Sequence, residues 1–66
     1  MKKFIINNEG LLTYVGKNVS IKYNGRYYKG VLEKWVEHGG NYYSFNIRNV
    51  LRNIHWWNVE SIKEVK

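Results

Sequence analysis

Apolar and polar residues alternate along residues 16–35, on both sides of one strong turn signal. In the first half, Val19, Ile21 and Tyr23 share one face, which is the period-2 pattern of a half-buried strand. Asn24-Gly25 follows, and this dipeptide readily takes the positive φ angles that a two-residue type I′ hairpin loop requires. The pattern therefore predicts an antiparallel hairpin around which the rest of the chain is arranged.

The second strand of this hairpin is predicted over residues 26–36. Gly30 lies in its middle, where a side chain would obstruct a bend or a close backbone approach. Residues 37–41 read EHGGN and predict the next turn, with Gly39-Gly40 as its pivot. Residues 42–47 alternate cleanly and predict the third strand.

The rest of the C-terminal half predicts two more strands. Arg48-Asn49 is expected to make a short reversal into a fourth strand over residues 50–57. That strand has apolar residues at both odd and even positions, as in a strand that is covered on both sides or bulged. A tight turn over residues 58–61 and a last strand over residues 62–65 are expected to follow.

The N-terminal part is less regular. Residues 4–6 predict a short strand, and residues 9–15 predict one helical turn with Leu11, Leu12 and Val15 on its inner side. No helical period persists for ten residues anywhere in the chain.

Five short strands joined by tight turns favour an all-β fold, a small five-stranded antiparallel barrel of the SH3-like class, because there are too few strands for two sheets. Sixty-six residues make a single domain with a thin core. The consistent apolar faces of the clearest strands predict a core made of Val19, Ile21, Leu32, Phe45, Ile47 and Ile62.

The composition favours a polyanionic partner. The net charge is +6 and the pI is near 9.7. Three tryptophans, six tyrosines and two phenylalanines are more aromatic residues than so small a core can bury. Consecutive pairs such as Tyr27-Tyr28, Tyr42-Tyr43 and Trp56-Trp57 must send one ring to each face if they lie in strands. Exposed aromatic rings next to cations are typical of surfaces on which nucleic-acid bases stack.

Catalysis and cofactor chemistry have little support in the sequence. There is no cysteine, and the only titratable groups suited to acid–base work are the adjacent Glu37-His38 and the isolated His55, which we assign to packing or surface. Gly39-Gly40 lacks the lysine and hydroxyl residue of a phosphate-binding loop. We therefore expect a protein that is not an enzyme and has neither a cofactor nor a metal.

Targeting signals are also missing. The N-terminal apolar run has three residues, far short of a signal-peptide core, and no run approaches the roughly 18 residues that span a bilayer. We expect a cytoplasmic protein with no membrane partner.

The first hairpin resembles the first motif of the Sm-like proteins. The residues that carry the resemblance are Gly16, Lys17, Val19, Ile21, Tyr23, Asn24-Gly25-Arg26, Tyr28, Gly30 and Leu32. Sm-like proteins are bent five-stranded barrels that assemble into RNA-binding rings, so the resemblance implies that fold and an RNA partner. It also implies that His38 stacks on a base, Asn41 reads a base edge and Arg52 closes the pocket.

These observations together predict a protein that binds single-stranded nucleic acid, RNA in preference to DNA. The expected contacts are Arg26, Tyr27, Lys34, His38, Asn41, Tyr42 and Arg52. Further aromatic and cationic candidates are Trp35, Trp56 or Trp57, Lys29 and Arg48.

Two other functions fit the same residues. One is a protein-interaction module, such as a phage or mobile-element product that blocks a host protein through its aromatic residues. The other is an oligomer that holds a small nucleotide between subunits. In each case we expect a homo-oligomer, because a small barrel has open strand edges and this chain has no proline to block them.

Overall fold

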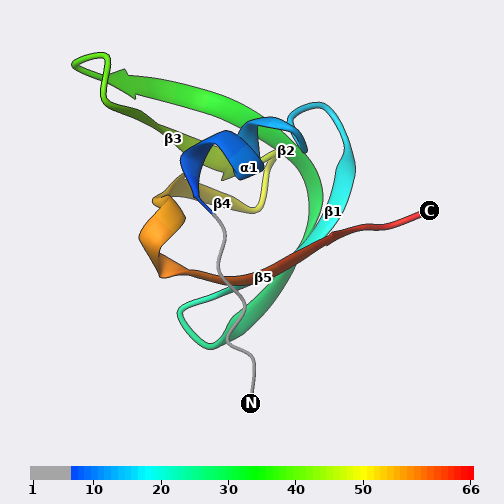
Figure 1. Ribbon diagram of the computed structural model, residues 1–66. Coiled ribbons are helices and arrows are strands. Elements are labelled where there is room, and N and C mark those ends of the chain that lie inside the picture. Colours follow the sequence, from blue (N-terminus) through cyan, green and yellow to red (C-terminus); the bar gives the residue numbers. More distant parts are fainter. Residues whose placement is uncertain (1–6) are drawn as a thin grey trace.

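The computed structural model describes residues 7–66 (Figure 1), so the strand expected at residues 4–6 lies outside the described part. A short helix precedes five antiparallel strands that form one sheet in the order β4-β3-β2-β1-β5. The elements are α1 (Asn8–Leu12), β1 (Asn18–Tyr23), β2 (Arg26–His38), β3 (Tyr42–Ile47), β4 (Leu51–Ile54) and β5 (Val59–Glu64). The predicted all-β fold with five antiparallel strands is confirmed. No helix in the described residues is long and apolar enough to cross a membrane.

The long strand β2 belongs to both halves of the sheet. Its first part pairs with β1 and its second part with β3, and Figure 1 shows the strand curving between them. Gly30 lies at this passage with a φ of 151°, and a Cβ there would lie 2.6 Å from Cγ2 of Ile47. Only glycine fits both the backbone angle and the space, so the predicted bend at Gly30 is confirmed.

Both predicted hairpin turns are present. Asn24 and Gly25 have φ angles of 51° and 82°, as a type I′ loop requires. The second turn pivots on Gly39 and Gly40, which also have positive φ. The turn is shorter than predicted, because residues 37 and 38 still pair with β3 and extend β2 by two residues beyond Val36.

The core contains all six predicted residues, each less than a tenth exposed. Four further apolar side chains complete it: Leu11, Tyr23, Ile54 and Val59. Leu11 comes from α1, whose first turn is capped by the Asn7 side chain accepting from the Gly10 amide at 2.8 Å. Val15 is exposed, contrary to the prediction, because the helix ends at Leu12 and the helical period stops before it.

The fourth strand is shorter than the predicted 50–57. Val50 lies in the preceding turn, and a 3₁₀ turn, η1 (Trp56–Asn58), follows β4. Between β3 and β4, Ile47 pairs with Leu51 and Phe45 pairs with Ile54. One residue of β3 but two residues of β4 lie between these two pairs. This is the bulge that the mixed apolar pattern indicated. Asn53, one of the two residues on β4, accommodates the extra residue with a positive φ of 63°.

The last strand begins three residues earlier than predicted. Residues 59–61 were expected in a turn, but the reversal is already completed by η1, so β5 starts at Val59. Trp56-Trp57 therefore does not lie in a strand, and the alternation argument does not apply to this pair.

β4 and β5 are the two edges of the sheet, and within residues 7–66 no ladder joins them. The Tyr23 hydroxyl from β1 makes the connection instead. It donates to the Asn53 carbonyl and accepts from the His55 amide, each at 3.3 Å. One buried side chain thus ties the end of β4 to the β1–β5 half.

Replacing Gly30 with Ala should lower the free energy of unfolding by roughly 2 to 5 kcal/mol, because the added methyl meets a buried branched side chain and the backbone angle is strained. Urea unfolding measures this effect. Gly16→Ala is the matched control, since Gly16 has a φ of 87° but no atom within 4 Å of an added Cβ. Equal losses in the two variants would show that Ile47 does not enforce the bend.

Replacing Tyr23 with Phe should cost about 1 kcal/mol, the usual net value of a lost hydrogen bond, because two backbone groups lose their partner while the ring stays in place. Hydrogen exchange should become faster at the His55 amide and leave the Ile21 amide protected. Unchanged exchange at His55 would mean that the hydroxyl does not hold the end of β4.

Candidate functional site

The end of the β2–β3 hairpin brings two rings face to face. His38 and Tyr42 are direct partners in the antiparallel register, where side chains on the same face stand close together. Their ring centroids are 4.5 Å apart and the planes differ by 13°. This stack therefore follows from the tight turn at residues 39–41.

The segment after β4 adds a second stack. His55 precedes η1 and its ring lies against Trp57, with centroids 4.7 Å apart and planes 9° from parallel. The Asn58 amide donates to the His55 carbonyl at 3.0 Å, which closes the turn that holds the two rings together. The second pair is therefore built by a local turn and placed by the end of β4.

The two stacks meet and form one group of rings. The ring of Tyr42 lies 5.1 Å from that of Trp57 at an angle of 66°, and His38 lies 5.8 Å from His55. Trp56 approaches Trp57 at 5.7 Å and 81°. We call His38, Tyr42, His55, Trp56 and Trp57 the aromatic cluster. Such offset and edge-to-face contacts each contribute about 0.5 to 1.5 kcal/mol beyond area burial, so the cluster is a preformed surface.

Exposure differs within the aromatic cluster. Trp57 is 52% exposed, whereas the other four rings are half-buried. Nε2 of His38 and Nδ1 of His55 are buried with no hydrogen-bond partner in the described residues. Neither imidazole is oriented by a carboxylate there, and no group of three or more metal-ligating side chains occurs among residues 7–66. The part of the cluster that a ligand can reach is mainly the Trp57 ring.

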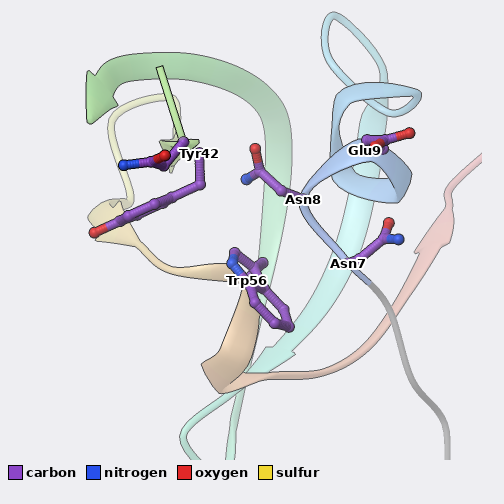
Figure 2. Close-up of a pocket in the computed structure, with 6 residues that line it drawn as sticks. Asn7, Asn8, Glu9, Tyr42 and Trp56 are labelled. Atoms are coloured by element: carbon purple, nitrogen blue, oxygen red, sulfur yellow. The ribbon is translucent and has the colours of Figure 1, made fainter. Parts of the chain in front are cut away.

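A hollow of about 200 Å³ lies beside the cluster (Figure 2). Its lining residues are Asn7, Asn8, Glu9, Asn41, Tyr42 and Trp56. The side-chain amide of Asn8 donates a hydrogen bond to the Tyr43 backbone carbonyl and accepts one from the Tyr43 backbone amide, both at 2.9 Å. This side chain therefore pairs with β3 as the backbone of a neighbouring strand would. In Figure 2 the Glu9 carboxylate points away from the two rings. Asn8 is therefore occupied by its hydrogen bonds to β3, whereas Asn41 is exposed.

The predicted contact residues do not all lie in one place. His38, Asn41 and Tyr42 lie together at the β2–β3 hairpin. Arg26 and Tyr27 lie at the opposite end of β2, where Tyr27 is 69% exposed with the Lys22 amine 5.7 Å from its ring centroid.

The two remaining cations lie over other rings. The Lys34 amine lies 4.7 Å from the centroid of Tyr43. The Arg52 guanidinium lies 5.9 Å from that of Trp35, so its described contact is with this ring rather than with His38 or Asn41.

His55 is the cluster member that sequence reasoning assigned to packing or surface. Its stack on Trp57 is built by the turn η1 and not by strand alternation, so no period-2 pattern indicated it. The contact with Tyr42 and His38 has no local signal, because it joins residues that are distant in the sequence.

The surface charge is partly neutralised by ion pairs. Arg48 meets Glu33 at 2.7 Å, Lys22 meets Glu60 at 3.7 Å and Lys17 meets Glu64 at 3.9 Å. These exposed pairs contribute at most about 1 kcal/mol each. Within residues 7–66, the cations without such a pair are Arg26, Lys29, Lys34, Arg52, Lys63 and Lys66.

No protein-family model, curated protein or solved structure matches this chain.

Proposed function

We propose that this protein binds single-stranded nucleic acid, RNA in preference to DNA, without catalysing a reaction. The observation that carries the proposal is the aromatic cluster, in which the half-exposed Trp57 ends a stack on His55. Every base has a flat π face, and stacking on an aromatic side chain contributes about 1 to 3 kcal/mol per base. A base that stacks on Trp57 therefore extends an arrangement of rings that already exists.

The cluster needs little ordering when it binds. Each of its rings contacts at least one other ring, so few rotamers remain to be lost on association. Tyr42 and His38 each have one face covered by the other. Their contribution to stacking is therefore limited to their outer faces, and Trp57 is the principal platform.

Unpaired cations supply the phosphate contacts. Arg52 lies on β4, which ends immediately before His55. Lys34 lies over Tyr43, which points to the face of β3 opposite to Tyr42, so Arg52 is the cation better placed to meet a strand that leaves the cluster. The preference for RNA rests on the resemblance of the first hairpin to the Sm-like motif.

Trp57→Ala should weaken binding of a short single-stranded RNA by about 1 to 3 kcal/mol, because one base loses its stacking partner. Fluorescence anisotropy of a labelled oligonucleotide at low salt measures the affinity, and circular dichroism shows that the variant is folded. Trp57→Phe is the matched control and should retain most of the affinity. The slope of log affinity against log salt should be the same for all three proteins, since no phosphate contact changes.

Arg52→Glu should have the complementary effect. The salt slope should shrink by about 0.7, the value of one phosphate contact on a single strand, while stacking on Trp57 is retained. If the folded protein binds neither RNA nor DNA oligonucleotides at low salt, the proposal is wrong and a protein partner becomes the leading function.

The proposal includes self-association through the edges of the sheet. β4 and β5 have no strand partner on their outer sides in the described residues, and no proline interrupts either edge. Unpaired strand edges are templates for pairing with another chain. Sedimentation equilibrium should show a mass above the 8.0 kDa monomer that increases with concentration. A monomer at high micromolar concentration would exclude this part of the proposal.

A further inference from the structure

The outer face of the β5–β1–β2 half carries two cross-strand rows of polar residues. Ser20 on β1 pairs with Lys29 on one side and with Lys63 on the other. In the next row Lys22 pairs with Tyr27 and with Ser61. These side chains lie opposite to the face that carries Val19 and Ile21 into the core, because successive residues in a strand point to opposite sides.

A hollow of about 300 Å³ opens over these rows. Its lining residues are Ser20, Tyr27, Ser61, Ile62 and Lys63, and we call it the Ser20 groove. Ser20 is 8% exposed, whereas Tyr27, at 69%, is the most exposed large aromatic residue in the described part of the chain. The groove therefore offers two hydroxyl groups next to an accessible ring.

The charge at the groove is positive. Lys29 and Lys63 are exposed, and neither has a carboxylate within ion-pair distance among residues 7–66. The two glutamates on β5 are engaged elsewhere, Glu60 with Lys22 and Glu64 with Lys17. The unpaired ammonium group of Lys63 thus lines the groove, that of Lys29 belongs to the strand partner of Ser20 on the other side, and both glutamates of β5 are engaged in ion pairs.

The spacing of the strands suits a single anion. Neighbouring strands lie about 4.8 Å apart, so Lys29 and Lys63 start about 10 Å apart on either side of Ser20. A lysine ammonium is a point charge on a flexible stem, so both can turn toward a group seated above the serine. Phosphate oxygens accept hydrogen bonds from ammonium and hydroxyl donors alike, and these are the donors that the groove provides.

We propose that the Ser20 groove binds the phosphate of a nucleotide, with Lys29 and Lys63 neutralising the charge, Ser20 and Ser61 donating hydrogen bonds, and Tyr27 stacking on the attached base. The ligand is either a free nucleotide or one unit of a polynucleotide. In the second case the inference deepens the proposed function, because the groove holds the chain at the end of β2 remote from the aromatic cluster. The Tyr27 ring is the reason for a nucleotide rather than inorganic phosphate.

Backbone NMR titration tests the inference with three probes: uridine monophosphate, adenosine monophosphate and inorganic phosphate. Both nucleotides should shift the amide signals of Ser20, Ser61 and Lys63 and the ring signals of Tyr27. Inorganic phosphate should shift the serine and lysine signals at higher concentration and leave the Tyr27 ring unchanged. Equal affinity for inorganic phosphate and nucleotides would show that Tyr27 does not stack on the base.

Variants separate charge from stacking. The double variant Lys29→Gln, Lys63→Gln should bind both nucleotides about tenfold more weakly, the usual scale for losing charge-assisted contacts at an exposed site. Lys66→Gln is the matched control and should leave nucleotide binding unchanged, because Lys66 has no ion pair within residues 7–66 and does not line the groove. Tyr27→Ala should weaken the binding of nucleotides but not that of inorganic phosphate. Tyr27→Phe should bind both like the unmodified protein.

The two sites give distinguishable failures. Trp57→Ala should weaken the binding of RNA and leave intact the shifts that nucleotides cause at Ser20. If Trp57→Ala does not weaken RNA binding while these shifts are still observed, only the proposed function is contradicted. If the groove serves a polynucleotide, an oligonucleotide long enough to reach both sites should bind the double lysine variant more weakly than the unmodified protein. If the groove serves free nucleotides, this oligonucleotide should bind both proteins equally. No shift at Ser20, Ser61 or Lys63 with millimolar nucleotide, in the folded protein, would overturn the inference.

Discussion

The contact of Ile47 with the backbone of Gly30 is the constraint on which the two halves of the sheet depend. The Ile47 methyl occupies the space where any other residue at position 30 would carry its Cβ. β2 can therefore pass from its pairing with β1 to its pairing with β3 while the core side chains of both halves stay in contact. In a domain this small, a single well-packed core has little stability to spare, so the close fit at one glycine has a large effect.

The Tyr23 hydroxyl connects the fold to the aromatic cluster. It accepts a hydrogen bond from the His55 amide, and the His55 ring in turn stacks on Trp57. A buried polar group must have its hydrogen-bond partners, so this position favours tyrosine over phenylalanine even though both rings would fill the core. The segment that carries His55 and Trp57 is thereby tied to β1, which lies on the other side of the bend in β2.

The two surfaces have complementary chemistry. The aromatic cluster offers stacking with few cations in direct contact, and the hollow beside it is lined mainly by amide side chains and rings. The Ser20 groove offers ammonium and hydroxyl groups with one exposed ring. Tyr27 of the groove lies near the start of β2 and His38 of the cluster lies at its end, so a chain of several nucleotides would be needed to reach both. Stacking without sequence readout, combined with phosphate contacts, is how many proteins hold single strands.

The sequence by itself determined the strands, the two hairpins and most of the core, because each depends on neighbours along the chain. Alternation places Val19, Ile21, Phe45 and Ile47 on buried faces, and the positive φ angles of the turns need particular residues such as Asn24-Gly25.

The tertiary structure decided the ends of β4 and β5, the exposure of Val15 and the composition of the site. β4 stops where the bulge at Asn53 and the turn η1 redirect the chain, and no local pattern encodes that point. His38 and Tyr42 could be placed together from the hairpin, but their contact with His55 and Trp57 joins the hairpin to the segment after β4, which is distant in the sequence. Which lysines keep their charge unpaired also depends on cross-strand distances, so the Ser20 groove becomes visible only when β5 lies beside β1.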